Sequence, residues 1–413
     1  MFIHLYPQTQ CPWDPTTPSL RSDGNCSALV DDDTDESLAH RILANTPWTH
    51  APYCLVPRSI GSEQKFCVYS SSAFNDGSGI SIIATPETAA TLAAAVQNPS
   101  PAWRARRHLA HQARAYSVIP MPGKGMGVIA TRRIAQFEAF MTSFPAVIAD
   151  NDFFPDDEDA GGPSEGKRLF QRALDQLSDK KRFLSLAKSK GEDVHVLEDV
   201  LRTNAFGITV NGRDAKGLYP EIARLNHACD PNAYGRFTKG DLAMSAVATR
   251  DIMPGEEITI SYIPLGMPTP YRAKSLANWG FNCTCGLCSA PAEAREASDQ
   301  RRERLVDIFY AMDKVPQSDY QELVDLTREF VDLLQIERLE AKVGEYFQAF
   351  MRIYYNIGDA DSAMRYAKAA LRYAETFGDP EGGFCEGLRR DMDVIRRVLD
   401  DQKEMQRQRQ GEE

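Results

Sequence analysis

The chain has 413 residues, an ordinary apolar content of 43% and a net charge of −11. It is long enough for two or three domains with sizeable cores, and its acidity argues against a general nucleic-acid binder. No apolar stretch approaches the roughly 18 residues that cross a bilayer, and the first residues lack the basic and apolar regions of a secretory signal. We therefore expect no membrane association and a nuclear or cytoplasmic location, with secretion as the alternative if a longer precursor carries a signal peptide.

The first part of the chain combines a loose segment with a hairpin. Residues 1–62 are rich in Pro, Ser, Thr and Asp, which favours loose order apart from a short helix near 35–45. Residues 63–114 predict a hairpin that turns at Asn75-Asp76-Gly77, and then a helix that opens with Pro86.

The cysteines of this first part have long and irregular gaps, which do not fit a metal site; they are Cys11, Cys26, Cys54 and Cys67. We favour buried thiols. The alternative is two disulfides, which would need an oxidising compartment.

Two similar stretches, GSGISIIATPETA at 77–89 and GKGMGVIATRRIA at 123–135, each suit a glycine turn that leads into a short buried strand. The first has Ser81 where the second has Gly127, and a Cβ there would obstruct close approach of a ligand to the backbone. We expect a structural hairpin at the first and a cofactor loop at the second, because the motifs described below follow the second stretch.

The rest of the chain changes from short strands to helices. Apolar residues at helical spacing predict helices between 166 and 203, and turn residues separate short strands over 205–263. From about 292 the pattern is that of long amphipathic helices. One pair that meets at 356–359 resembles a tetratricopeptide-type hairpin, although an ordinary helical bundle fits equally well. The tail at 403–413 is expected to fray.

A second group of cysteines has the spacing of a metal site. Cys283, Cys285 and Cys288 place three thiols on one tight loop, and structural zinc takes about four tetrahedral ligands. The fourth ligand must come from elsewhere. Cys229 is the favoured candidate and Cys385 the rival. With Cys229 as a ligand, zinc would hold Trp279 and Phe281 against the residues that precede Cys229.

Two motifs between the glycine loop and the cysteine loop carry polar groups. RLNHACDPNA at 224–233 contains Asn226, His227 and Asn232, and an Asn side chain can accept from an ammonium and donate to a carboxylate, as an amino-acid-like ligand requires. GEEITISY at 255–262 ends a short strand at Tyr262, a place where a lone tyrosine usually only packs its ring.

In this order, these motifs resemble those of the SET domain of protein lysine methyltransferases. They are GKGMGV, a TNAF segment at 203–206, RLNHACDPN, GEEITISY and a cysteine-rich post-SET segment. Together with helices after the zinc loop, the chain looks most like the SET-and-MYND family and related fungal SET proteins. It departs from them in Ala228, where the family has serine, and in the absence of cysteine from 130–200, so that the MYND finger is missing.

The resemblance implies an α+β fold, in which a SET domain of short strands with a post-SET zinc loop precedes an all-α, tetratricopeptide-like domain. It divides the chain into the following parts: the loose segment 1–62; a hairpin and helices at 63–114 that pack on the SET domain; the SET domain at 115–265 with a helical insertion at 150–203; the zinc segment 266–290; the helical domain 291–402; and the tail 403–413.

The resemblance also implies a role for individual residues. The expected S-adenosylmethionine contacts are Lys124, Gly125, Met126, Gly127, Asn204, Asn226, His227 and Phe281. The expected lysine channel consists of Phe206, Tyr234 and Trp279, and the expected catalytic residue is Tyr262. The expected zinc ligands are Cys229, Cys283, Cys285 and Cys288.

The resulting hypothesis is a protein lysine methyltransferase with one structural zinc and S-adenosylmethionine as cosubstrate. Its partner would be a protein with an accessible lysine, such as a histone tail, and we expect a monomer that binds neither nucleic acid nor membrane. The alternative is a catalytically weak scaffold that binds S-adenosylmethionine and zinc and uses its helices for protein interaction. A third interpretation, a zinc module for nucleic acid, is disfavoured by the net charge.

Overall fold

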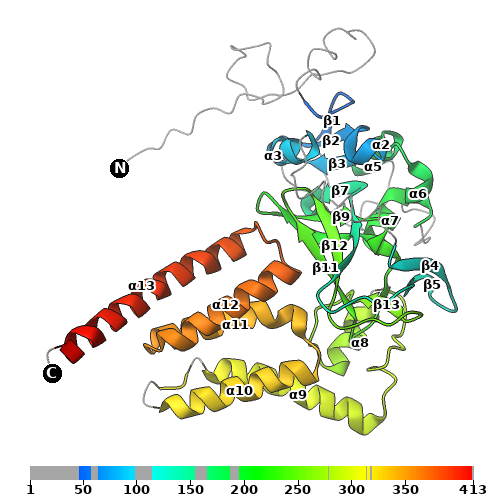
Figure 1. Cartoon of the computed structure of the whole chain (residues 1–413). Helices are drawn as coiled ribbons and strands as arrows, with labels where there is room; N and C mark the ends of the chain where they lie inside the picture. The colour runs from blue at the N-terminus through cyan, green and yellow to red at the C-terminus, as the bar shows by residue number, and fades with distance from the viewer. Residues whose placement is uncertain are drawn as a thin grey trace, which may run out of the picture. The chain divides into compact units, whose positions relative to one another are not determined.

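The structure is a computed structural model, which describes residues 46–56, 64–97, 114–153, 165–186, 195–277, 279–312, 314–316 and 319–411 (Figure 1). The predicted helix near 35–45, Cys11 and Cys26 lie outside the described residues. The chain divides into two compact units that alternate along the sequence. The first takes its residues from 1–107, 143–223 and 240–243, and the second from 108–142, 224–239 and 244–413.

The first unit contains a six-stranded sheet in the order β1-β2-β3-β7-β9-β8. Its strands are β1 (Tyr53–Leu55), β2 (Phe66–Ser71), β3 (Ile80–Ala84), β7 (Val147–Asp150), β8 (Phe206–Val210) and β9 (Arg213–Leu218). The helices of this unit are α2 (Phe74–Gly77), α3 (Pro86–Gln97), α5 (Glu165–Asp175), α6 (Lys180–Leu184) and α7 (Val196–Asn204). A single 3₁₀ turn, η2 (Asn151–Phe153), follows β7, and another, η3 (Ile222–Arg224), lies at the boundary between the two units. Apolar side chains of α5 and α7 form one core with those of β2, β3 and β7.

The predicted hairpin is confirmed, because β2 and β3 pair antiparallel with Val68 opposite Ile83. Asn75 and Asp76, with φ of 48° and 54°, turn the chain between them. Ser81 of β3 is fully buried, and its hydroxyl donates to the carbonyl of Ala173 at 2.9 Å. The first of the two glycine stretches is therefore structural, as expected, and its serine serves the core. The helix that opens with Pro86 is confirmed as α3.

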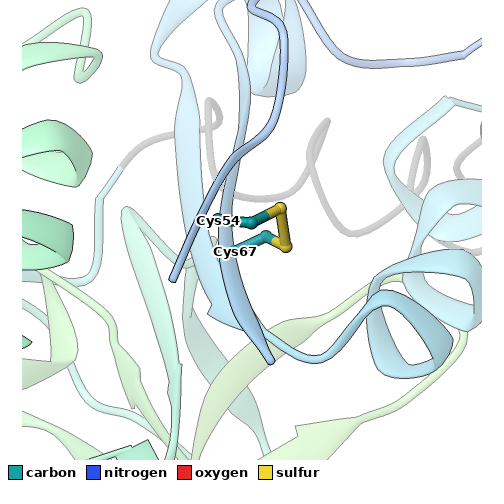
Figure 2. Close-up of a disulfide and its surroundings, with 2 residues drawn as sticks. All are labelled: Cys54 and Cys67. Carbon is teal, nitrogen blue, oxygen red and sulfur yellow. A yellow bond between two sulfur atoms is a disulfide. The ribbon is translucent and has the colours of Figure 1, made fainter. Parts of the chain in front are cut away.

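The preference for free thiols is wrong for one pair of cysteines. Cys54 of β1 and Cys67 of β2 lie opposite one another in the antiparallel register, and a disulfide joins them (Figure 2). The cause is the strand β1, which sequence analysis did not find inside the segment 1–62. Directly opposed residues of paired strands bring their Cβ atoms close enough to be bridged.

The second unit contains two smaller sheets. One has the order β10-β13-β5-β4, and the other has the order β11-β12-β6. One end residue of β6 (Ser143) and one of β12 (Ala243) are assigned to the first unit. The strands are β4 (Tyr116–Met121), β5 (Gly125–Ala130), β6 (Ala139–Ser143), β10 (Asn226–His227), β11 (Ala233–Thr238), β12 (Ala243–Ala248) and β13 (Glu257–Ile260). The short strands expected over 205–263 are thus confirmed.

Helices make up the rest of the second unit. They are α8 (Thr269–Ala277), α9 (Ala292–Met312), α10 (Tyr320–Ile336), the turn η5 (Glu340–Lys342), α11 (Val343–Asn356), α12 (Ala360–Phe377) and α13 (Gly383–Gly411). The predicted α+β fold class, with short strands followed by an all-helical region, is confirmed. Among the described residues, no helix is long and apolar enough to span a membrane. The domain boundaries expected from the resemblance stay a prediction.

The helical pair predicted around 356–359 is α11 and α12. Small residues of α12 such as Ala367 and Ala370 are fully buried, and Gly344 of α11 faces the backbone of Ala370 and Ala374, so the two helices approach closely. The expectation of a frayed tail differs from the structure, in which α13 continues to Gly411. Ion pairs at i,i+3, such as Lys403 with Asp400, support helix there.

The capping of α12 generates a first prediction. The side chain of Asp359 accepts a hydrogen bond from the N–H of Ser362 at 2.9 Å and another from the hydroxyl of Tyr320 at 2.6 Å. Asp359→Ala should lower the free energy of unfolding by about 1 kcal/mol, the usual value of an N-cap. Urea denaturation measures this loss. Asp361→Ala in the same turn, which removes an acidic residue but no cap, should cost clearly less, and equal losses would contradict the capping role.

Candidate functional site

A two-residue parallel pairing in the second unit brings two of the predicted motifs together. Asn226 and His227 form β10, which pairs with Thr259 and Ile260 of β13. The N–H of Ala228 continues the ladder with a bond to the carbonyl of Ile260 at 3.0 Å. The RLNHACDPNA segment therefore lies beside the strand that leads into Tyr262, as the site hypothesis requires.

Asn232 fixes this pairing from the side. It is 2% exposed, its Oδ1 accepts the N–H of Thr259 at 2.8 Å, and its Nδ2 donates to the carbonyl of Glu257 at 2.8 Å. A buried amide whose donor and acceptor are both satisfied by backbone replaces missing ladder bonds. Asn232, which sequence analysis grouped with possible ligand contacts, is therefore a structural residue.

Asn226, Glu257 and Lys124 form a polar chain at the start of the glycine loop. Asn226 Nδ2 donates to Glu257 Oε1 at 3.0 Å, and Lys124 Nζ donates to Glu257 Oε2 at 2.7 Å. No hydrogen bond from another described residue reaches Asn226 Oδ1. Because Glu257 fixes the amide orientation, this oxygen is presented as an acceptor, and the Lys124 ammonium is held on the other oxygen of the same carboxylate.

The hydrogen bond between Asn226 and Glu257 requires a glycine at position 127 of β5. A Cβ at this position would lie 2.7 Å from Asn226 Nδ2 and 2.5 Å from Met121 Cγ, closer than real Cβ contacts. The third glycine of GKGMGV therefore makes room for the Asn226 side chain. Gly123 and Gly125, with φ of 72° and 73°, form the tight turn between β4 and β5 that carries Lys124.

His227 is buried and neutral. Its Nδ1 accepts the N–H of Tyr262 at 3.0 Å, so the ring proton belongs on Nε2, which lies 3.2 Å from Cys229 Sγ. Burial lowers the pKa of the imidazole to about 4. The histidine thus connects the catalytic candidate Tyr262 with the predicted metal ligand Cys229, as an outer partner that orients a ligand does.

Tyr262 is the centre of an aromatic cluster. Its hydroxyl donates to the carbonyl of Leu225 at 2.7 Å, and its ring centroid lies 4.9 Å from that of Trp279 and 6.4 Å from that of Phe281. Burial, with a smaller effect of the Glu257 charge, raises the pKa of Tyr262 to about 12. The phenol therefore stays protonated at neutral pH, and since its one O–H is donated to the Leu225 carbonyl, its oxygen can accept a hydrogen bond from a ligand.

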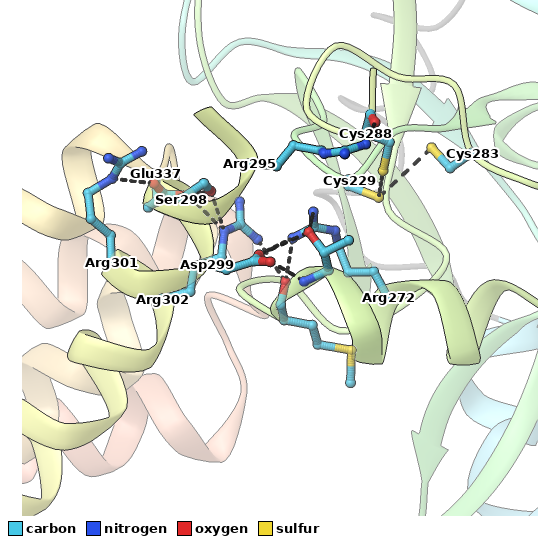
Figure 3. Close-up of polar contacts among 12 residues, drawn as sticks. Cys229, Arg272, Cys283, Cys288, Arg295, Ser298, Asp299, Arg301, Arg302 and Glu337 are labelled. Carbon is cyan, nitrogen blue, oxygen red and sulfur yellow. Dashed lines mark hydrogen bonds and ion pairs between the residues drawn. The ribbon is translucent and has the colours of Figure 1, made fainter. Parts of the chain in front are cut away.

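The four cysteines of the predicted zinc site converge. The sulfur atoms of Cys229, Cys283, Cys285 and Cys288 all lie within 4.8 Å of one another. Figure 3 shows three of them, those of Cys229, Cys283 and Cys288. The Cys229 sulfur is 3.5 Å from that of Cys288 and 3.9 Å from that of Cys283, and sulfur atoms on a tetrahedral zinc are about 3.8 Å apart for bonds of about 2.3 Å. The cluster could hold one metal ion, and four thiols are ligands that suit zinc. The rival Cys385 lies instead in the buried core of the helices.

Three of the predicted site residues do not belong to this assembly of contacts. Asn204 and Phe206 belong to the first unit, where the Asn204 amide donates to the carbonyl of Leu186 and the Phe206 ring packs on Tyr219. Tyr234 packs its ring edge-on against Phe377 of α12. Their parts in cofactor binding and in the lysine channel stay predictions.

Sequence analysis missed Glu257, the hub of the polar chain. The only available signal was the pair of acids in GEEITISY, and the two acids differ in role. Glu256 accepts from Asn232 and pairs with Arg250 outside the site, whereas Glu257 connects Asn226 with Lys124. Glu256 lies just before β13, and its carbonyl accepts the N–H of Ala130, so it continues the pairing with β5. Neighbouring residues of extended, paired backbone face opposite sides, which explains the division.

The family model described as "SET domain" matches residues 125–263, a stretch that holds β5, β10 and β13 of this arrangement. The resemblance found in the sequence is thereby confirmed. The chain is 27% identical to the histone-lysine N-methyltransferase set5 of Schizosaccharomyces pombe over 199 residues, which cover 47% of this chain and 57% of that protein.

Two shorter matches, to human proteins named SMYD3 and SMYD2, are consistent with the SET-and-MYND-like resemblance. The chain is 45% identical to human histone-lysine N-methyltransferase SMYD3 over 73 residues, 17% of each protein. It is 34% identical to human N-lysine methyltransferase SMYD2 over 109 residues, 24% of this chain and 25% of that protein. The matched region thus spans between 17% and 57% of the length of these relatives.

The close approach at Gly127 can be tested by substitution. Gly127→Ala should displace the Asn226 amide. If the loop binds the cosubstrate that the resemblance implies, the substitution should also weaken binding of S-adenosylhomocysteine at least tenfold, or about 1.4 kcal/mol, as measured by titration calorimetry. The matched control is Gly235→Ala in β11, where the nearest atom to the new Cβ is Met244 Sδ at an ordinary 3.5 Å. Equal affinities for both variants would contradict the assigned role of Gly127.

The cysteine cluster predicts that substituting one of its members, but not Cys385, removes the bound zinc. Elemental analysis of the purified protein should find one zinc per chain, and Cys283→Ser should lose it because one of four ligands is removed. Cys385→Ser should keep the zinc, since this thiol lies in the helical core. Retention of zinc by Cys283→Ser, or its loss from Cys385→Ser, would show that the ligand set is wrong.

Proposed function

We propose that this protein is a protein lysine N-methyltransferase that uses S-adenosylmethionine as its methyl donor. The observation that carries the proposal is the position of Tyr262, which lies beside His227, Trp279 and Phe281 at the end of the strand that pairs with Asn226. The names of the matched relatives, which include histone-lysine and N-lysine methyltransferases, support the same reaction class.

The residues present fit the amino-acid part of such a cosubstrate. Asn226 Oδ1 is presented as an acceptor for an ammonium, and Lys124 places a positive charge near it for a carboxylate. The ring of Phe281 is 37% exposed beside His227, so it offers a flat apolar surface for a nucleobase. S-adenosylmethionine, when bound, would supply an electrophilic methyl group on a sulfonium.

The protein's own task is to position a lysine and to favour its neutral form, whose proton is lost to solvent before methyl transfer. A free lysine has a pKa of about 10.4, so it is mostly charged at neutral pH and cannot attack. Aromatic walls such as Tyr262 and Trp279 disfavour the charged amine by desolvation and lower its pKa. The Tyr262 hydroxyl, already directed by the Leu225 carbonyl, orients the neutral amine. It need not act as a base, and its raised pKa agrees with a protonated role.

The substrate class follows from this chemistry. We propose a protein with an accessible lysine, and a basic segment such as a histone tail would be attracted by the net charge of −11. The scaffold alternative has no observation in its favour, because Asn226, His227 and Tyr262 are all present in one arrangement.

A methyl-transfer assay tests the proposal. Purified protein receives methyl-labelled S-adenosylmethionine with core histones and, separately, with whole-cell extract. We expect label on discrete protein bands, and Tyr262→Phe should reduce the rate about 10²–10³-fold, the usual effect of removing one positioned hydrogen-bonding group.

The variant keeps the ring and its contacts with Trp279, so its zinc content and thermal unfolding should match the wild type. No label on any protein, despite bound S-adenosylmethionine and zinc, would favour the scaffold alternative. Label that persists at the wild-type rate in Tyr262→Phe would remove this residue from the mechanism.

A further inference from the structure

A buried charged cluster of the second unit has no part in the function proposed so far. We name it the arginine cluster. It lies where α8, α9 and the end of α10 meet, and it consists of Arg272, Ser298, Asp299, Arg302 and Glu337 (Figure 3). The side chains of Arg302 and Glu337 are 1% and 3% exposed. Buried charges are costly unless fully paired, so the contacts that satisfy them indicate their purpose.

Glu337 is satisfied from α9. Its Oε2 accepts from Arg302 Nε at 2.7 Å and from the Ser298 hydroxyl at 2.6 Å, and its Oε1 accepts from Arg301 Nε at 2.6 Å. These hydrogen bonds outweigh the effect of burial and hold the pKa of the Glu337 carboxyl below its usual value. The carboxylate is therefore charged, and it fixes the plane of the Arg302 guanidinium.

The two buried arginines converge on a single backbone atom outside the helices. Arg272 Nη1 donates to the carbonyl of Met267 at 2.7 Å, and Arg302 Nη1 donates to the same oxygen at 3.2 Å. The rigid fork of an arginine can serve Glu337 with one nitrogen and Met267 with another, whereas a lysine has a single donor group. Arg302 therefore connects the helical region to the chain segment that precedes α8.

Asp299 holds the start of α8 in the same way. Its Oδ1 accepts from both the N–H and the hydroxyl of Thr269, at 2.8 and 3.0 Å, and lies 3.6 Å from Arg272 Nη1. A carboxylate at this end of a helix satisfies an otherwise unpaired donor and interacts favourably with the helix dipole. Helix α9 thus fixes the first turn of α8 at two points.

The other end of α8 leads directly into the aromatic cluster. Leu276 packs with Cys229 and Ile263, and the N–H of Trp279 donates to the Leu276 carbonyl at 2.9 Å. The Met267 side chain packs against the same group, together with Trp279 and the zinc-loop cysteines. A short helix held at both ends transmits position rather than bending. The arginine cluster and the ring of Trp279, 4.9 Å from Tyr262, are therefore one connected assembly.

We propose that Arg302 is a positioning residue, which holds Met267 and α8 so that Trp279 and Phe281 stand correctly beside Tyr262. This inference rests on the proposed function and gives the helical region a part in the site itself. Apolar residues would connect the helices at a lower desolvation cost. Two buried arginines that donate to the Met267 carbonyl instead fix the direction of the segment that leads into α8. The rings of Trp279 and Phe281 need such a fixed position if they are to line a cosubstrate site.

Arg302→Lys is the sharpest variant. It keeps a charge for Glu337 but loses the simultaneous bond to the Met267 carbonyl. The matched control is Arg304→Lys, two residues along α9, where Arg304 forms a two-pronged pair with Glu329 and both side chains are exposed. Both variants make the same chemical change on the same helix.

Two readouts are needed. We expect amide hydrogen exchange of peptides covering 267–281 to accelerate in Arg302→Lys, while α11 and α12 exchange at the wild-type rate. We also expect the Kd for S-adenosylhomocysteine to rise about tenfold, a usual size for lost coupling between neighbouring groups, with zinc content unchanged. Arg304→Lys should change neither quantity.

The outcomes separate this inference from the proposed function. Unchanged exchange at 267–281 would overturn it, and so would uniformly faster exchange over the whole unit, which would mean that Arg302 only stabilises the fold. If the wild type bound no S-adenosylhomocysteine, the proposed function would fail, and local exchange alone would then decide whether Arg302 positions α8. Glu337→Gln, which releases the guanidinium without removing it, should reproduce the local effect, and its failure to do so would count against the cluster.

Discussion

The pairing of two residues in β10 with two in β13 is the contact on which the site depends. A parallel pair of this length is weak by itself, because a few slanted hydrogen bonds cannot offset the entropy of ordering two distant segments. Asn232 supplies side-chain bonds on one side, and His227 adds a bond to the N–H of Tyr262. Asn226, His227 and Tyr262 are all placed through this short ladder.

The site distributes charge according to depth. His227 is neutral and Tyr262 is protonated at neutral pH, so neither of these two side chains brings a charge to the buried centre. Lys124 and Glu257 keep their charges nearer to solvent, with side chains 40% and 19% exposed. In the proposed function, this division suits a zwitterionic amino-acid moiety at the rim and an uncharged amine in the centre. Burial accounts for the neutral imidazole of His227 and the protonated phenol of Tyr262.

The sequence motifs pointed to the residues that carry the chemistry of the site, but not to the residues that hold them in position. Spacing alone predicted a metal-binding loop at 283–288, and in the structure Cys229 is the fourth member of that cysteine cluster. It lies there because β10, two residues before it, pairs with β13. Glu257 and Arg302 could not be identified, since a buried charge looks like a solvated one until its distant partner is known. Local patterns likewise missed β1, which has only three residues and is defined by its pairing with β2.

The matched family region and the folded unit have different limits. Residues 125–263 omit β4, which pairs with β5 from Tyr116 to Met121, and they omit three of the four clustered cysteines. A fragment cut at these limits would leave β5 with an open edge, a template for aggregation, and Cys229 without its partners. The two units also alternate along the chain, so that neither corresponds to one continuous stretch. Gene fusions and truncations of this protein must therefore respect contacts rather than the limits of a sequence match.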